Sequence, residues 1–167
     1  MKGIKVQKLK ALFEQHKPKT IKEIKHLLPI KVRFLSSGHF RDIYSIKRCE
    51  AIIKIPKVYT PRPGDVEAHV NPVIHSRKEI DRIAEINSSP ELEHLRRYLP
   101  EIIYADRKTG VIVMKKYTRK KRKKFNLQER ILVRMFRDTL KMYTADYGKK
   151  NLLRDENDEP IVVDLGY

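Results

Sequence analysis

The stretch that decides the fold is KVRFLSSGHFRDIYSIKRCEAIIKIP, residues 31–56. It contains three short segments, KVRFL, FRDIYSI and EAIIKIP, that are rich in β-branched and aromatic residues and partly alternate between apolar and polar side chains. Such segments, separated by glycine, serine or charged residues, are typical of consecutive strands. The sequence therefore predicts three strands joined by short turns.

Two helices are predicted before this stretch. Apolar residues recur at helical spacing in residues 4–16, while lysines occupy much of the rest of that segment. A second, shorter helix is predicted to begin after Thr20, with Glu23 as its capping-box partner, and to end before Pro29. Residues 1–30 are thus expected to form a helical extension.

The residues after position 56 alternate between further helices and strands. Residues 60–71 contain two prolines and a glycine and are predicted to form a loop. Helices are predicted from Pro72 to Ile86, over residues 91–99 and over 126–144, and strands over 100–106, over 110–117 and on both sides of an acidic turn at 154–159. In the 126–144 helix we expect a buried face with Leu127, Ile131 and Met135, beside Leu132, Phe136 and Leu140. This order predicts an α+β fold.

Charge is the most unusual feature of the composition. The chain has 38 Lys and Arg against 21 Asp and Glu, a formal net charge of +17. Such a balance favours polyanionic partners such as nucleic acid, nucleotide phosphates or acidic lipid, and a merely well-solvated surface is the alternative. The single cysteine, Cys49, and the lack of a signal peptide or of an apolar run of about 20 residues predict a cytoplasmic protein without a membrane span. The scattered histidines show no zinc-binding spacing, so no structural metal is expected.

The segment LSSGHFRDIY, residues 35–44, matches part of a phosphate-covering glycine loop, L-G-x-G-x-F-G-x-V. Leu35, Gly38, Phe40 and Ile43 are in register with that pattern, whereas Ser36 and Arg41 stand at its first and third glycines. Glycine is used in such loops because backbone amides must approach phosphate oxygens closely. An ordinary hairpin turn is the alternative interpretation.

Lys54 lies on the third predicted strand between two isoleucines. It is either a surface lysine of an edge strand or a phosphate ligand, and a phosphate ligand needs a carboxylate to fix its position. Glu79 is the preferred partner because it lies at the margin of the apolar face of the next long helix. Glu67, in the proline-rich loop, and Glu85, farther along the helix, are the alternatives.

The C-terminal residues contain Asp146, Asn151 and the triplet Asp-Leu-Gly at 164–166. Phosphoryl transfer requires one carboxylate that orients the attacking hydroxyl, and a carboxamide and a second carboxylate that hold Mg²⁺. Asp146, Asn151 and Asp164 have these types in this order. The acidic residues between them, at 155–159, are interpreted as a solvated hairpin turn.

Together these motifs resemble those of the protein-kinase superfamily, from about Phe34 to Tyr167. The resemblance is greatest to small atypical bacterial or phage kinases and RIO-type kinases. It implies a five-stranded N-lobe over residues 31–117, a minimal C-lobe over 118–167, and ATP and Mg²⁺ as cofactors. It implies that Asp146, Lys54 and Glu79 are catalytic and that Asn151 and Asp164 bind the metal. The nucleotide-binding residues that it implies are Ser36, Gly38, Phe40, Ile43, Ile52, Lys54 and Met114.

Several positions depart from the pattern of the family. Thr144 and Ala145 replace the usual pair before the catalytic aspartate, and Ile52 replaces the small alanine over the adenine. Gly148 stands where protein kinases commonly have a catalytic-loop lysine, a role that Lys149 could take. No activation segment or peptide-docking helices follow Tyr167, so we expect either a minimal phosphotransferase or part of a larger one.

Three functions remain open on the sequence alone. The first is an ATP- and Mg²⁺-dependent serine/threonine kinase that acts on another protein or on itself. The second is a pseudokinase, an ATP-binding interaction module. The third is a nucleic-acid-binding protein on a kinase-like scaffold, for which the run KKYTRKKRKK, Lys115–Lys124, with eight Lys or Arg in ten residues, is the candidate contact surface. A solvated connector is the alternative for that run.

Overall fold

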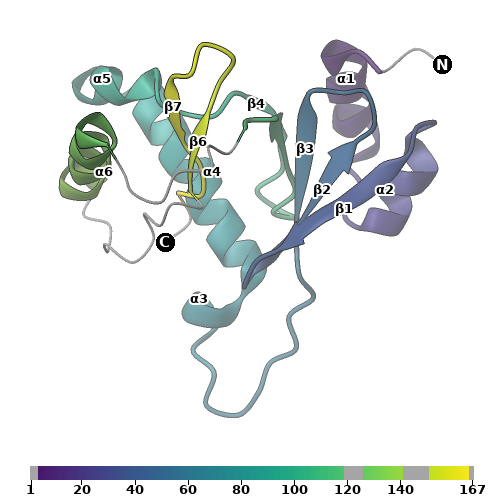
Figure 1. Cartoon of the computed structure of the whole chain (residues 1–167). Coiled ribbons are helices and arrows are strands. Elements are labelled where there is room, and N and C mark those ends of the chain that lie inside the picture. Colours follow the sequence, from purple (N-terminus) through teal and green to yellow (C-terminus); the bar gives the residue numbers. More distant parts are fainter. Residues whose placement is uncertain (1–3, 119–125, 141–150, 166–167) are drawn as a thin grey trace. The chain divides into compact units, whose positions relative to one another are not determined.

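The computed structural model describes residues 4–118, 126–140 and 151–165 (Figure 1). Asp146 and most of the basic run therefore lie outside the described residues. The helices are α1 (Val6–His16), α2 (Ile21–Leu27), α3 (Glu67–Val70), α4 (Pro72–Ser88), a 3₁₀ turn (Pro90–Leu92), α5 (Glu93–Arg96) and α6 (Leu127–Leu140). The strands are β1 (Val32–Ser37), β2 (Arg41–Ile46), β3 (Ala51–Pro56), β4 (Ile102–Ala105), β5 (Ile112–Lys115), β6 (Leu152–Arg154) and β7 (Pro160–Val162). The chain is thus α+β, as predicted.

The chain divides into two compact units. The first unit consists of Met1–Ile80 and Glu101–Lys116, and the second of Asp81–Pro100 and Tyr117–Tyr167. Helix α4 contributes its first half to the first unit and its second half to the second.

The first unit is built on a five-stranded antiparallel sheet with the strand order β1-β2-β3-β5-β4. The three strands predicted over residues 31–56 form its first half as consecutive hairpins. In β3, which is an interior strand, Lys54 pairs with Ile43 of β2 on one side and with Ile112 of β5 on the other. Ile52 pairs with Met114 of β5 in the same way.

One face of this sheet forms a hydrophobic core with the two N-terminal helices. Leu9 and Phe13 of α1 and Ile24 of α2 are fully buried in the same cluster as Ile53 and Val113 of the sheet. The predicted capping box starts α2: the Thr20 hydroxyl accepts from the Glu23 amide, and the Glu23 carboxylate accepts from the Thr20 amide. Both helices use their apolar stripes against this face, and the residues that alternate with its core residues, such as Ile52 and Lys54, point to the opposite face.

The turn before β5 depends on a glycine. Gly110 has φ +73°, and its amide donates to the Asp106 carbonyl at 2.7 Å. A Cβ added at this position would lie 2.8 Å from Cγ of Pro56 and 2.9 Å from Cβ of Ser76. Both the backbone angle and the space therefore require glycine, so that β3 and α4 can approach the turn closely.

In the second unit, a buried ion pair joins β6 to the start of α6. Arg154 of β6 contacts Glu129 near the start of α6, and both side chains are buried. Glu129 also forms a capping box with Asn126, in which the Glu129 amide donates to the Asn126 side chain at 2.8 Å and the Asn126 amide donates to the Glu129 carboxylate at 2.7 Å. The backbone of Thr118 pairs with that of Arg154. Arg154 thus fixes the chain on both sides of the segment 119–125.

The structure corrects three expectations. Residues 60–71 are not entirely loop, because α3 forms within them. Residues 91–99 do not form one continuous helix but a 3₁₀ turn followed by the four-residue helix α5. In α6, Leu127 and Ile131 are 73% and 57% exposed, and the buried residues are Glu129, Leu132 and Phe136. The prediction is thus confirmed for Leu132 and Phe136 and wrong for Leu127 and Ile131, because the helix turns the stripe that contains Glu129 inward, toward Arg154.

Within the residues that the structure describes, every helix is too short or too polar to traverse a lipid bilayer.

Candidate functional site

The face of the sheet opposite the N-terminal helices carries four of the predicted nucleotide-binding residues. Residues that pair across neighbouring strands point to the same face, and successive residues point to opposite faces. Ile43, Lys54, Ile52 and Met114 therefore share one face. Ile53 and Val113, which alternate with them, belong to the core beneath α1 and α2.

The structure brings Lys54 and Glu79 together. Nζ of Lys54 donates to Oε1 of Glu79 at 2.7 Å, and the two side chains are only 5% and 0% exposed. Lys54 is thus a buried residue of an interior strand, which excludes the alternative of a surface lysine on an edge strand. Of the competing carboxylates, Glu67 accepts from Asn71 on the surface and Glu85 is exposed.

Arg41 is a third member of this cluster that the sequence did not reveal. It is the first residue of β2, it is buried, and its Nη1 donates to Oε2 of Glu79. Arg41 stands at the third glycine of the glycine-loop pattern, so sequence reasoning had treated it only as a departure. Its partner lies 38 residues along the chain, and no local pattern marks such a pair.

The three charges shift one another's ionisation. Burial lowers the pKa of Lys54 to about 8, and the charge of Arg41 acts in the same direction, whereas the charge of Glu79 opposes it. For Glu79, burial by itself raises the pKa, but the charges of Arg41 and Lys54 outweigh burial and hold it at about 2. Glu79 is therefore ionised at neutral pH and Lys54 is close to its point of deprotonation.

The β1–β2 hairpin closes on itself at the glycine-loop motif. The amide of Gly38 donates to the carbonyl of Arg41 at 2.8 Å, and the hydroxyl of Ser37 donates to Asp42 at 2.7 Å. Ser36 is exposed at a shift in the β1–β2 register. A Cβ at Gly38 would lie 3.5 Å from the Arg41 carbonyl oxygen, an ordinary contact, so the fold of the hairpin does not itself require this glycine.

Phe40 connects the hairpin to α4. Its ring stacks on that of His75, with the centroids 3.8 Å apart and the planes at 15°. His75 precedes Glu79 by four residues, so the two lie on the same side of α4. Phe40 is thus a packing contact between hairpin and helix in this structure.

The candidate metal-binding residues belong to the second unit. The amide of Val163 donates to the carbonyl of Asn151 at 2.8 Å, which places Asn151 beside the residue that precedes Asp164. Asp164 itself has φ +70°, a conformation that residues other than glycine seldom adopt and that often occurs at functional sites. The carbonyl of the next residue, Leu165, accepts from Nη1 of Arg82 at 2.6 Å. Asp146 lies outside the described residues.

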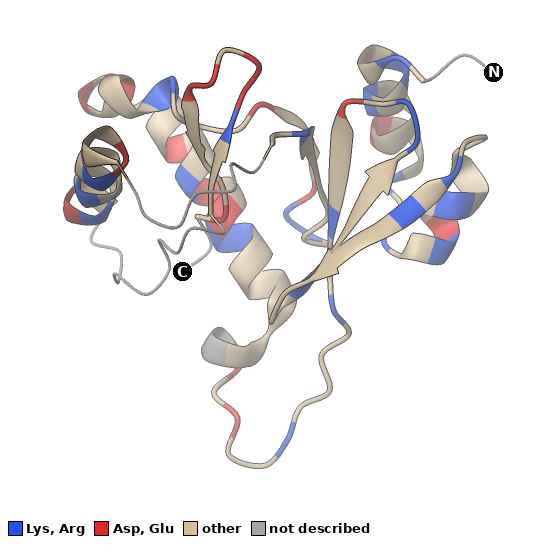
Figure 2. Cartoon of the chain, in the orientation of Figure 1, with Lys and Arg blue, Asp and Glu red and all other residues tan. Residues whose placement is uncertain are grey.

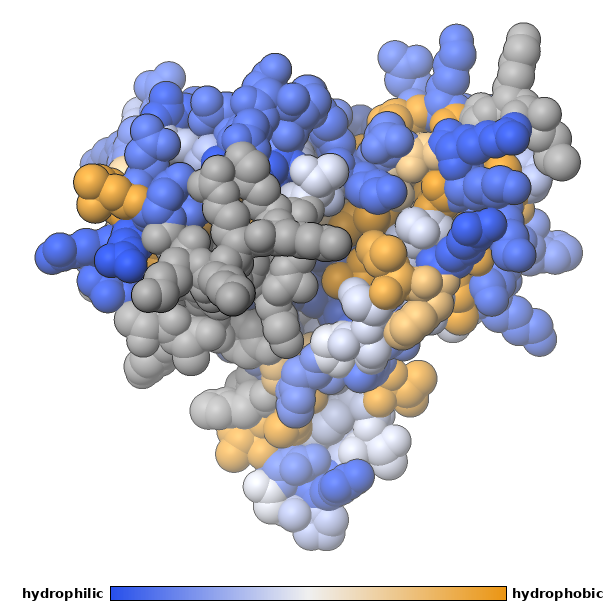
Figure 3. Space-filling model, in the orientation of Figure 1, coloured by the Kyte–Doolittle hydropathy of each residue, from blue (hydrophilic) through white to orange (hydrophobic). Residues whose placement is uncertain are grey.

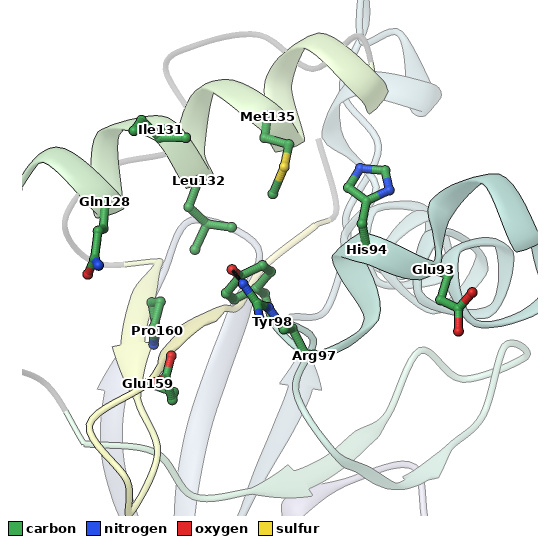
Figure 4. A pocket seen from close by; sticks show the side chains of 10 residues that line it. All are labelled: Glu93, His94, Arg97, Tyr98, Gln128, Ile131, Leu132, Met135, Glu159 and Pro160. Atoms are coloured by element: carbon green, nitrogen blue, oxygen red, sulfur yellow. Dashed lines mark hydrogen bonds between the residues drawn. The ribbon is translucent and has the colours of Figure 1, made fainter.

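A separate cavity of about 660 Å³ lies in the second unit (Figure 4). Its apolar part comes from Ile131, Leu132 and Met135 of α6, and Glu93 of α5 and Glu159, just before β7, are charged residues that flank it. Its lining residues are Glu93, His94, Arg97, Tyr98, Gln128, Ile131, Leu132, Met135, Glu159 and Pro160. None of the predicted catalytic, nucleotide-binding or metal-binding residues that the structure describes is among them.

No family model matches the chain, and no curated protein matches its sequence. Among solved structures, the chain is similar to the Rio2 kinase–ADP/Mg²⁺–phosphoaspartate complex from Chaetomium thermophilum, with 16% identity and a TM-score of 0.45. The match covers 87% of this chain and 50% of that one, so the chain spans about half the length of the Rio2 structure.

Proposed function

We propose that this protein binds ATP with Mg²⁺ and transfers the γ-phosphoryl group to a serine or threonine hydroxyl, on another protein or on itself. The observation that supports this best is the buried ion pair between Lys54 and Glu79. It lies on the face of the sheet that also carries Ile52 and Met114. An ammonium held in a fixed position beside an apolar surface is suited to a ligand with an aromatic base and a phosphate chain.

In this proposal the residues of the first unit bind and align the nucleotide. Ile52, Ile43 and Met114 supply the apolar surface for the adenine, and Lys54 contacts the phosphates. Glu79 orients the ammonium and, because it is ionised, keeps Lys54 positively charged over a wider range of pH than burial alone would allow.

The residues of the second unit act on the metal and on the acceptor. In this proposal Asn151 and Asp164 supply amide and carboxylate oxygens, the hard ligands that Mg²⁺ takes. The backbone hydrogen bond from Val163, the neighbour of Asp164, to Asn151 supports this assignment. The ion, when bound, would neutralise charge on the β- and γ-phosphates. Asp146 is assigned to orient the acceptor hydroxyl and to accept its proton.

The first test is the effect of nucleotide on stability. ATP should raise the melting temperature in the presence of Mg²⁺ and much less in EDTA, because a ligand that binds only the folded state stabilises it. Asp164→Ala should remove the metal-dependent part of the shift. An equal shift with and without metal would reject the assignment of Asp164.

Transfer of label from γ-labelled ATP then separates an enzyme from a binding module. Asp146→Asn retains the size of the side chain but removes its charge, so nucleotide binding should persist while transfer falls by about 10²–10⁴-fold. If Asp146→Asn and the wild type behave alike in every transfer assay while both bind ATP, the pseudokinase alternative stands instead.

A further inference from the structure

We propose that Arg41 is a positioning residue that holds Glu79 in place and thereby orients Lys54, so that helix α4 is tied to the β1–β2 hairpin before any nucleotide binds. As far as phosphoryl transfer is concerned, this inference rests on the proposed function. The contact itself is a property of the first unit and is tested separately.

The two oxygens of Glu79 bind two different cations. Oε1 accepts from Lys54 at 2.7 Å, and Oε2 accepts from Arg41. These cations come from β3 and β2, which are neighbouring strands of the sheet. A carboxylate held at one oxygen can rotate about its last bond, whereas one held at both oxygens is fixed in orientation. Arg41 therefore determines where Oε1 lies, and with it the ammonium of Lys54.

A second contact acts beside the first. Phe40 stacks on His75, while Arg41, the next residue, binds Glu79 one turn later in α4. Phe40, just before β2, and Arg41, its first residue, thus hold two successive turns of the helix. Displacement of α4 from the sheet would have to break both contacts, one of which is an ion pair that is shielded from water.

The charge of Arg41 indicates that it does more than fill space. The cluster holds two cations and one anion, all of them buried, and a buried cation is costly unless it is paired. An uncharged side chain of similar length would fill the same volume without that cost. The charge of Arg41 also opposes protonation of Lys54, so the two cations are electrostatically coupled through the carboxylate that they share.

The experiment compares Arg41→Met, which retains most of the volume without the charge, with Arg41→Lys, which retains the charge. Arg33→Met is the matched control, because Arg33 is exposed on the adjacent strand β1. Three quantities are measured: the NMR titration of the Lys54 side chain without nucleotide, the hydrogen exchange of α4 amides, and the kcat and KM for ATP.

In Arg41→Met, we expect the pKa of Lys54 to rise, because a neighbouring positive charge is lost, and the amides around Glu79 to exchange faster. We expect kcat to fall roughly 10- to 100-fold, the loss associated with a hydrogen bond to a charged group, with a smaller change in KM. In Arg41→Lys, the Lys54 pKa, the exchange rates and kcat should all lie close to their wild-type values. Arg33→Met should leave all three at the wild-type values. If Arg41→Met does not fold, Arg41→Gln replaces it in the same comparisons.

Wild-type exchange and wild-type kcat in Arg41→Met would overturn the proposal, because Arg41 would then only fill volume. An unchanged Lys54 titration in folded Arg41→Met would overturn it as well. If the wild type neither binds ATP nor transfers phosphate, the proposed function fails, but the titration and the exchange still decide whether Arg41 positions the pair.

Discussion

Burial of the Lys54 ammonium lowers its pKa to about 8, so this side chain changes its charge near the pH at which enzymes commonly work. A lysine whose pKa in the folded state lies below its ordinary value of 10.5 destabilises the folded protein below pH 8. Between pH 8 and pH 10.5 the unfolded chain binds the proton and the folded one does not, so the free energy of unfolding rises with pH over this interval. The folded protein thus keeps a buried lysine at the expense of stability, and residues with such shifted pKa values are concentrated at functional sites.

Nucleotide binding should therefore be accompanied by uptake of a proton. The phosphates of ATP bring negative charge to Lys54 and raise its pKa, so Mg²⁺–ATP should bind with proton uptake that is largest above pH 8, between the pKa of free Lys54 and its raised value. Calorimetry in several buffers of different ionisation enthalpy measures the number of protons. Lys54→Met should abolish the uptake, and an equal number of protons in the variant and the wild type would contradict this role of Lys54.

Single residues of the site differed in how well the sequence could predict them. Lys54 and Glu79 were predicted as a pair from their apolar neighbours and their order, and the structure joins them. Arg41 was not predicted, because a buried arginine and an exposed one look the same in sequence when the partner is distant. The roles of Asp146, Asn151 and Asp164 remain predictions.

At the scale of elements, the periodicity of apolar residues predicted most helices and strands, and its failures have a common cause. The spacing of apolar residues and the local composition correctly predicted α1, α2 and the five strands of the sheet. They failed for Leu127 and Ile131 of α6. This helix has two apolar stripes, and the ion pair between Glu129 and Arg154 turns the stripe with Leu132 and Phe136 inward. Long-range pairing of charges is not visible in a local pattern.

Two glycines with positive φ provide a test of how closely β3, α4 and the turn before β5 pack. Gly64→Ala meets no atom within 4 Å, so it should cost only the backbone strain, about 1–2 kcal/mol. Gly110→Ala has the same strain and in addition forces Pro56 and Ser76 apart, so it should lose about 1–3 kcal/mol more in urea unfolding. Equal losses in the two variants would mean that the turn is not closely packed.

For the whole molecule, the net charge of +17 is the dominant physical property. Lysines and arginines are distributed over α1, α2 and β1 (Figure 2), and the visible outer side of the two N-terminal helices is strongly hydrophilic (Figure 3). The exposed residues there include Lys8, Lys10, Lys22 and Lys25. A polyanion could therefore be attracted by the positive charge of the whole protein surface or could bind to the basic run Lys115–Lys124 alone.

Salt dependence distinguishes these two cases. If the run Lys115–Lys124 contacts phosphates, replacement of Lys120, Lys121, Arg122 and Lys123 by serine should lower the slope of log K against log salt by about 0.9 for each lost contact with duplex DNA. ATP binding should be nearly unchanged. Replacement of Lys8, Lys10, Lys22 and Lys25 by serine is the control with the same loss of charge. Equal slopes in the two variants would favour the diffuse field over a local site.

The hydrogen bond from the Val162 amide to the Tyr98 carbonyl, at 2.8 Å, has a consequence for synthesis on the ribosome. The first unit has all its strands once Lys116 has been made, so its sheet can form early. The segment Asp81–Pro100, by contrast, belongs to a unit whose remaining residues come later, and it must wait for Val162. At about 5–20 residues per second, Tyr98 waits several seconds for this partner. During that interval the nascent chain carries a folded sheet and a half-exposed α4, the species that a chaperone would meet.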